Sequence, residues 1–287
     1  ALAEISRARG SYTPRPWSNL ACAGSLSGRC MIAITQSGFD EIRWLEIDAG
    51  RGTVPAGGFD IPTSRSSIAW LDQDSLLVAV GLSENEKGET GYPLTARLLR
   101  RGATLGSAPI IYRGAEGVDS ASVSSVGNTG SRFATITATH GTRPIETQFV
   151  DSSGALVAAP TAVDVEALGV VGNHALLTLL DDWERSGKDG SQTWQAGSII
   201  AISLSDPSRS ELVLNSNAGV WASGGAASTS ALVTRDAAYI SALESGVRSV
   251  FRASRENGVW TAERVLGDGR SVASLISADP VGLSVLG

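Results

Sequence analysis

The strongest constraint on the fold is a pattern that restarts about every fifty residues. New repeats begin near residues 17, 66, 118, 167, 218 and 271, and each holds short apolar strands separated by turns rich in Gly, Ser, Asn and Asp. A repeat of this length with about four strands is typical of a β-propeller. The sequence therefore predicts an all-β chain whose blades are a scaffold, so that any chemistry lies in loops or on another domain.

The repeat also predicts where the blades begin and end. Five full four-stranded blades are expected, followed by a partial one, at 17–65, 66–117, 118–166, 167–217, 218–270 and 271–287. Residues 1–16 lack the pattern and are expected to be an irregular N-terminal extension. Because a half blade leaves an open strand edge, and propellers protect their edges in a ring, we expect this chain to be part of a larger propeller.

Composition narrows the possible partners. The formal net charge is −6, and the basic residues are scattered, with Arg100 and Arg101 as the densest pair. Nucleic acid binding needs a basic face that displaces counterions, so we expect no nucleic acid partner. The longest apolar stretches fall short of the roughly 18 residues of a membrane span, so no membrane partner is expected either. The sequence is compatible with a location of the protein in either the cytoplasm or the periplasm.

Two cysteines, Cys22 and Cys30, flank a Gly- and Ser-rich turn and could face each other across a hairpin. They could form a disulfide, or they could be two buried thiols that behave as small apolar side chains. The spacing leaves both interpretations open.

The sequence offers no catalytic residue. No serine has glycine at both the −2 and +2 positions, as the nucleophile of an α/β-hydrolase requires. The two histidines, His140 and His174, stand at strand ends and are expected to be structural or surface residues. The glycine motifs that bind nucleotides are also absent. We therefore expect no catalytic, cofactor-binding or metal-binding residues in this chain, and no cofactor.

The acidic and aromatic residues are expected to have structural roles rather than to form binding or catalytic sites. Asp72 with Asp74, and Asp181 with Asp182, are expected to be turn residues that bind backbone groups, because they lack the ligand spacing of a calcium loop. The seven tryptophans are expected in the core or as loop anchors rather than as a carbohydrate platform. Two long polar loops, 82–93 and 181–194, are the segments in which function could lie.

Several motifs, in order and with matching spacing, resemble the propeller of the prolyl oligopeptidase family. The segment from Gly58 to Asp72 is similar to the family pattern G-F-x-(L/I)-P-x-x-(K/R)-x-x-(V/I)-x-W-x-D. Further similarities lie at 34–40, 74–78, 90–93, 100–102, 108–114, 182–183 and 194–200. Leu94 and Phe39 depart from the family pattern. The resemblance covers about residue 29 to the end of the chain.

The resemblance implies a seven-bladed propeller paired with a C-terminal α/β-hydrolase domain that carries a Ser-Asp-His triad. The propeller would restrict the active site to short peptides. This chain has no counterpart of the catalytic domain, so it is expected to be the non-catalytic gating portion of a serine peptidase. Two alternatives are a stand-alone propeller that serves as a binding module and a propeller glycosidase, which would need convergent carboxylates.

Overall fold

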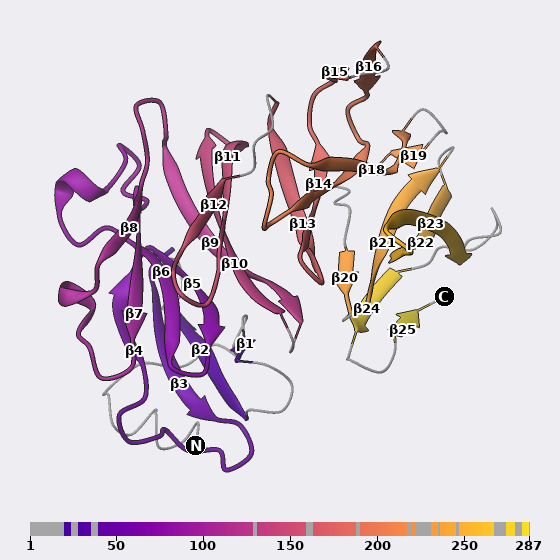
Figure 1. Cartoon of the computed structure of the whole chain (residues 1–287). Coiled ribbons are helices and arrows are strands. Elements are labelled where there is room, and N and C mark those ends of the chain that lie inside the picture. The colour runs from indigo at the N-terminus through magenta and orange to yellow at the C-terminus, as the bar shows by residue number, and fades with distance from the viewer. Residues whose placement is uncertain are drawn as a thin grey trace. The chain divides into compact units, whose positions relative to one another are not determined.

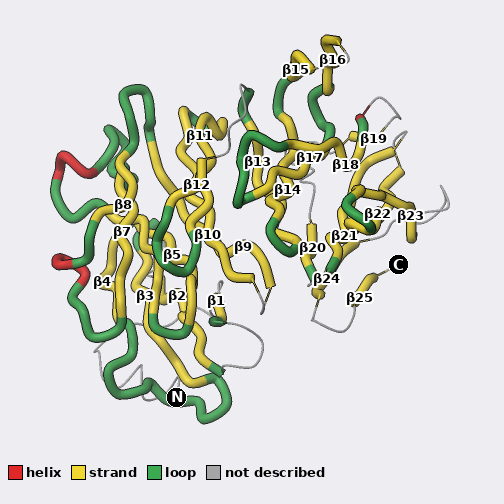
Figure 2. The backbone as a smooth tube through the Cα atoms, in the orientation of Figure 1, coloured by secondary structure: helices red, strands yellow, loops and turns green. Residues whose placement is uncertain are grey.

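The computed structural model describes most of the chain as β-strands. It describes residues 20–23, 28–35, 40–128, 131–158, 163–187, 190–216, 220–221, 231–234, 236–244, 247–266, 274–278 and 283–286. Two short 3-10 turns, η1 (Glu84–Glu86) and η2 (Leu105–Ser107), are drawn in red in Figure 2. The predicted all-β fold is confirmed.

The first two sheets are antiparallel and follow the chain order. Sheet one has the order β1-β2-β3-β4, and sheet two has the order β5-β6-β7-β8 (Figure 1). The strands of sheet one are β1 (Leu20–Cys22), β2 (Arg29–Thr35), β3 (Ile42–Asp48) and β4 (Asp60–Ser64). Those of sheet two are β5 (Ser66–Asp72), β6 (Ser75–Val80), β7 (Thr95–Arg100) and β8 (Ile110–Arg113).

Sheets three and four also have four strands. Sheet three has the order β12-β11-β10-β9, with β9 (Ser120–Asn128), β10 (Ser131–His140), β11 (Arg143–Val150) and β12 (Leu156–Ala158). Sheet four has the order β13-β14-β17-β18, with β13 (Val165–Val171), β14 (His174–Leu179), β17 (Ile199–Ser203) and β18 (Ser210–Leu214). Strand β13 begins two residues before the expected start of the fourth repeat.

The remaining strands form one larger sheet and two hairpins. Sheet five contains β19 (Val220–Trp221), β20 (Ala231–Val233), β21 (Ala237–Glu244), β22 (Val247–Glu256) and β23 (Val259–Leu266). One hairpin is β15 (Trp183–Gly187) with β16 (Gly190–Trp194), and the other is β24 (Ser274–Ala278) with β25 (Leu283–Leu286). The first hairpin differs from the long loop expected at 181–194. The alternation of apolar and polar residues in this segment is too short, and the segment is too polar, to indicate strands from the sequence.

The described chain forms two compact units. Sheets one and two lie in the first unit, sheets four and five lie in the second, and segments of sheet three belong to each. The sheets follow the repeats one after another, but the number of blades and their exact limits stay predictions.

The core of the first unit forms where apolar strand faces of sheets one and two pack together. Every residue of β6 is buried, as expected for a strand covered on both faces. The shared core includes Met31 and Trp44 from sheet one and Trp70, Leu76 and Val78 from sheet two. The rings of Phe59 and Trp70 meet edge to face, with centroids 5.7 Å apart. The predicted core positions of Trp44 and Trp70 are confirmed.

A buried carboxylate also joins sheets one and two. Glu46 on β3 is fully buried, and its carboxylate accepts hydrogen bonds from the Phe59 backbone N–H at 2.8 Å and from Arg101 Nη1 at 2.9 Å. Arg101 follows β7, and its guanidinium stacks 4.5 Å from the centre of the Phe59 ring. It also donates to Asp74 at 2.7 Å. Because each buried charge has a partner, the desolvation of Glu46 is offset.

Candidate functional site

A pocket of about 460 Å³ lies in the first unit, beside one of the two loops that the sequence singled out. Its wall combines the link between β4 and β5 with the 82–93 loop that follows β6. The residues around it are Glu41, Pro62, Thr63, Ser64, Arg65, Val80, Gly81, Leu82, Glu84, Lys87, Gly91 and Leu105. The pocket is therefore a cavity in which the loop could act.

A buried ion pair holds one side of this loop. Glu86 accepts a hydrogen bond from the Leu82 backbone N–H at 3.0 Å and one from Arg97 Nη2 at 2.7 Å. Burial alone would raise the pKa of Glu86, but these hydrogen bonds, together with the charges of Arg97 and Arg113, hold its pKa below the usual value. Because the carboxylate stays charged and bonded, the loop has a fixed anchor under the pocket.

A cation–π contact holds the other side of the loop. The Arg65 guanidinium lies 4.9 Å from the centre of the Tyr92 ring and donates to the backbone carbonyl of Thr90. A Cβ on Gly91 would lie 3.1 Å from Arg65 Nη1, in a backbone conformation with φ of +79° that favours glycine. Thr90, Gly91 and Tyr92 belong to a motif that carries the family resemblance. Through these contacts, the residues of the motif support the 82–93 loop.

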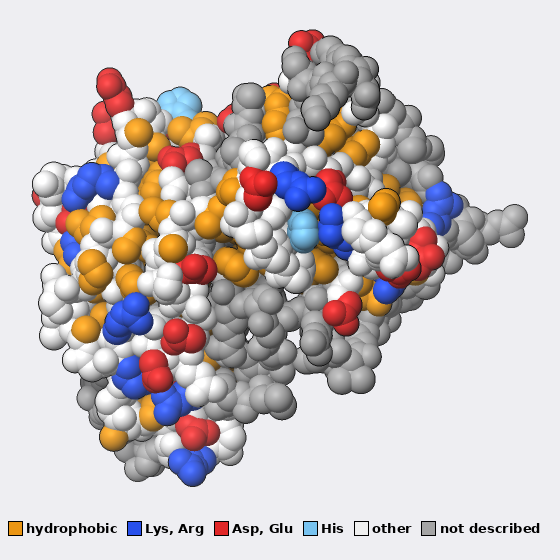
Figure 3. Space-filling view, in the orientation of Figure 1, with side chains coloured by type: hydrophobic (Ala, Val, Ile, Leu, Met, Phe, Trp, Pro, Cys, Tyr) orange, Lys and Arg blue, Asp and Glu red, His pale blue; other side chains and the backbone are white. Residues whose placement is uncertain are grey.

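Two basic residues that line the pocket, Lys87 and Arg65, each have an acidic partner. Lys87 Nζ lies 2.7 Å from Glu84 Oε1, and Arg65 Nη2 lies 3.9 Å from Asp40 Oδ2. On the face drawn in Figure 3, blue and red side chains likewise lie among one another. A pocket with balanced charge can accept a polar group, but it favours neither an anion nor a cation.

The two histidines lie on different strands, β10 and β14, and their contacts within the described residues are with a carboxylate, a carbonyl and an aromatic ring. His140 is exposed, and its Nδ1 lies 3.2 Å from Asp119 Oδ2 and 3.2 Å from the Gly117 carbonyl. His174 meets the Trp260 ring edge to face at 5.8 Å. Burial first, and then the charge of Arg255, lower the pKa of His174 below its usual value. The predicted structural or surface roles of both histidines fit these contacts.

The two cysteines form a disulfide, which decides between the two interpretations of the sequence. Cys22 and Cys30 are opposite each other in the register of β1 and β2. Their neighbours Ala23 and Arg29 are joined by a backbone hydrogen bond of 2.9 Å. The cysteines therefore occupy the next, non-hydrogen-bonded pair, where opposing side chains are closest.

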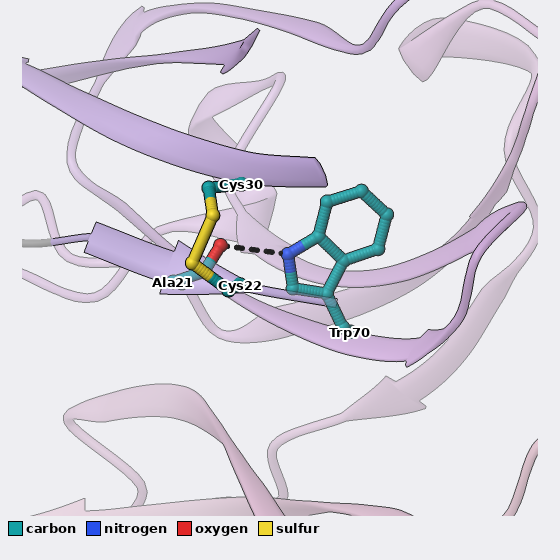
Figure 4. The surroundings of a disulfide bond; sticks show 4 residues. All are labelled: Ala21, Cys22, Cys30 and Trp70. Carbon is teal, nitrogen blue, oxygen red and sulfur yellow. Dashed lines mark hydrogen bonds between the residues drawn. A yellow bond between two sulfur atoms is a disulfide. The ribbon is translucent and has the colours of Figure 1, made fainter. Parts of the chain in front are cut away.

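The disulfide lies beside a contact between sheets one and two. The Trp70 Nε1–H donates to the carbonyl of Ala21 at 2.9 Å, next to Cys22 (Figure 4). Strand β1 has only three residues, so the disulfide and this hydrogen bond contribute much of what holds it in place. The disulfide is therefore a structural link between β1 and β2.

The acidic and aromatic candidates have structural contacts. Asp72 Oδ1 accepts from the Asp74 backbone N–H at 2.7 Å, as expected for a turn residue. Asp182 instead accepts from the Ala196 backbone N–H at 2.8 Å, across the base of the β15–β16 hairpin. Trp183 and Trp194 are opposite each other in that hairpin, with ring centroids 5.6 Å apart. The anchoring role predicted for these tryptophans is confirmed.

Within the part of the chain that the structure describes, no group of three or more His, Cys, Asp or Glu side chains could hold a metal ion. Nor does any helix among the described residues have the length and apolar character needed to cross a membrane.

Known proteins share this fold. No family model matches the sequence. An uncharacterized peptidase, y4nA, from Sinorhizobium fredii is 25% identical over 201 residues, which cover 66% of this chain and 27% of that protein. A post-proline cleaving enzyme from Rickettsia typhi superposes on 91% of the chain with a TM-score of 0.74 and 16% identity. Oligopeptidase B from Leishmania major superposes on 96% with a TM-score of 0.67 and 13% identity.

The chain has the fold of a prolyl oligopeptidase propeller. The resemblance that the motifs indicated is thereby confirmed at the level of the fold. The chain spans 27% of the curated relative, 40% of the Rickettsia enzyme and 36% of the Leishmania enzyme. It thus corresponds to a minor part of each of these proteins.

The prolyl oligopeptidase propeller fold explains why sequence reasoning found motifs but no site. The motifs that carry the resemblance lie in strands, in turns and in residues that support loops. Trp70, Arg101 and Tyr92, for example, contact other residues of the same chain. Sequence reasoning missed Arg65 and Lys87 as pocket residues. Lys87 lies within the 82–93 loop and Arg65 lies between β4 and β5, and only the three-dimensional structure brings them to one pocket.

Proposed function

We propose that this chain is the propeller portion of a prolyl oligopeptidase-like serine peptidase that cleaves short peptides. The observation that carries the proposal is the match to the Rickettsia post-proline cleaving enzyme, which extends over 91% of this chain but only 40% of that enzyme. The catalytic α/β-hydrolase domain would be a separate domain of the parent protein and the main partner of this chain. The propeller itself would contribute no catalytic residue.

The role of the propeller in this proposal is steric. A ring of packed sheets admits only what can pass its channel or the gap beside the catalytic domain. The interlocked cores of the described sheets favour a rigid barrier, because strands such as β6 are buried along their whole length. Short peptides would therefore be cleaved and folded proteins would be excluded.

The test compares the 287-residue chain with the full product of its gene. The chain alone is expected to hydrolyse no peptide. The longer protein is expected to cleave short proline-containing peptides, with a kcat/KM that falls steeply as the substrate lengthens, and to leave a folded protein intact. Hydrolysis by the chain alone would contradict the proposal. A gene without a hydrolase domain would favour the stand-alone binding module instead.

A further inference from the structure

The pocket beside the 82–93 loop has walls that are fixed from within the protein. The Glu86 carboxylate binds Arg97 on one side of the loop, at 2.7 Å, and Arg65 donates to the Thr90 carbonyl on the other side. Because the loop is already held at both sides, little ordering is needed when a ligand enters. A cavity of about 460 Å³ is also within the range of small-molecule sites.

Part of the pocket lining is apolar and open to solvent. Pro62 and Leu82 are exposed, with 45% of the surface of Leu82 accessible, and Leu105 is half-buried. A ligand that covers these side chains removes apolar surface from water, which favours binding. The lining therefore suits a ligand that carries an apolar group.

A carboxylate also lines the pocket, on the side of sheet one. Glu41 comes just before β3 and is exposed. Among the residues that the structure describes, its carboxylate makes neither a hydrogen bond nor an ion pair. An ionised carboxylate only accepts hydrogen bonds, so Glu41 can receive a cationic donor that enters the pocket.

Two basic side chains line the pocket from other elements, Lys87 from the loop and Arg65 from the link between β4 and β5. The partner of Lys87 is Glu84, whose side chain is 92% exposed, and such a solvated pair is exchanged at little cost. Arg65 Nη2 lies 3.9 Å from Asp40 Oδ2, which is beyond hydrogen-bond distance. Both basic groups therefore keep N–H donors for an entering carboxylate.

We propose that this pocket binds a short peptide in its zwitterionic form. The ammonium group of the peptide lies beside Glu41, and its carboxylate lies beside Lys87 and Arg65. An apolar side chain of the peptide covers Leu82 and Leu105. A ligand with charges of both signs complements a lining with charges of both signs, whereas a simple anion or cation meets like charges as well. A dipeptide is the smallest such ligand, and two extended residues span about 7 Å.

The inference rests on the proposed function for the source of the ligand. Hydrolysis of a peptide bond consumes one water molecule and leaves a new carboxylate on one product and a new ammonium group on the other. A peptidase that cleaves short peptides therefore releases still shorter ones with two charged ends. The pocket would take up such products, and peptides with a blocked end would be poorer ligands.

The test is a calorimetric titration of the 287-residue chain with three dipeptides. Alanyl-leucine has both charged ends, N-acetyl-alanyl-leucine lacks the ammonium group, and alanyl-leucinamide lacks the carboxylate. Because exposed ion pairs contribute modestly, we expect alanyl-leucine to bind about three- to fivefold more tightly than either blocked form. Alanyl-asparagine, which has both charges but a polar side chain of similar size, should bind about threefold more weakly than alanyl-leucine. Equal affinities for alanyl-leucine and either blocked form would overturn the inference.

Two variants assign the charges. Glu41→Gln is expected to abolish the preference for a free over an acetylated N-terminus, and Lys87→Gln to reduce the preference for a free carboxylate over the amide. Arg65 is kept, because it also supports the loop. Glu89→Gln is the matched control, since Glu89 is exposed in the same loop but is not part of the lining, and it should keep both preferences. Unchanged preferences in Glu41→Gln and Lys87→Gln would also overturn the inference, provided that circular dichroism shows both variants folded.

The binding test and the peptidase test fail separately. Calorimetry needs no catalytic domain, so dipeptide binding that depends on Glu41 and Lys87 would stand even if the full gene product hydrolysed no peptide. Conversely, an active peptidase whose propeller does not distinguish free from blocked dipeptides would keep the proposed function and remove the peptide site.

Discussion

Neighbouring sheets are joined by different chemistry in the two compact units. Between sheets one and two, apolar packing is accompanied by Glu46 with Arg101, and by Trp70 with Ala21. Between sheets four and five the shared layer is apolar, and the ion pair of Arg255 with Glu211 lies at the surface. In this repeated architecture, neighbouring sheets can therefore be joined either by buried polar contacts or mainly by apolar packing.

The contrast is clearest in two carboxyl groups. Glu46 is fully buried and meets donors from a backbone N–H and from Arg101. Glu166 is only half-buried and meets none in the described chain. Complete burial therefore does not by itself make a carboxylate unfavourable, because what matters is whether its lost water is replaced by donors. The first group stabilises the fold, whereas the second is a half-buried carboxyl whose lost water no donor in the described chain replaces.

The largest expected effect is at Glu46. Glu46→Gln removes the charge but keeps the shape, so Arg101 loses its buried counterion, and we expect the free energy of unfolding to fall by about 3 kcal/mol. Urea denaturation of the chain measures this. Glu41→Gln, an exposed position just before β3, is the control and should change stability by less than about 0.5 kcal/mol. Equal losses of unfolding free energy in both variants would show that the polar contact between sheets one and two contributes little to stability.

The disulfide is expected to have the next largest effect. Replacing both Cys22 and Cys30 with serine releases a link between residues eight apart, which by loop entropy lowers the free energy of unfolding by about 2.5 kcal/mol. Amide hydrogen exchange should rise first in β1 and β2. Dithiothreitol should reproduce the effect in the unmodified chain and leave the double variant unchanged. Faster exchange in sheet two instead would mean that β1 is held mainly by Trp70.

The surface ion pair of the second unit should matter little. Arg255 Nη2 lies 2.9 Å from Glu211 Oε1, and both side chains are about one-third exposed. Solvent screens such a pair, so a double-mutant cycle of Arg255→Gln with Glu211→Gln should give a coupling energy of about 0.5 kcal/mol, and less at 1 M salt. A coupling energy above about 2 kcal/mol would mean that the contact between sheets four and five also depends on charge.

Much of the fold could be predicted from the sequence, because it depends on local patterns. The apolar run of β6 and the alternation in β3 identify strands directly. The β15–β16 hairpin was missed, since its polar residues resemble a loop, although Trp183 and Trp194 are opposite each other across it. Its location between strands of sheet four could be recognised only in three dimensions.

The pocket and the Glu166 carboxyl were harder to predict for the same reason. Glu166 stands in an ordinary strand sequence, and nothing in its neighbours shows that it would lack a partner. That property depends on which residues of β14 and sheet five face it, and these are set by register and packing. The Cys22–Cys30 spacing, in contrast, is local and already pointed to a pairing across a hairpin.

The smallest expected effect is the pH dependence contributed by Glu166. Burial raises its folded-state pKa above the unfolded value of about 4.3, so the folded chain loses stability relative to the unfolded chain as pH rises through this interval. Glu166→Gln does not titrate there. The variant should therefore be more stable than the unmodified chain at pH 7, and the difference should shrink below pH ~4. Thermal unfolding at both pH values measures it, with Glu256→Gln as the control. A variant that is less stable at pH 7 would mean that the Glu166 carboxylate has a stabilising partner within the protein, and the contrast with Glu46 would be lost.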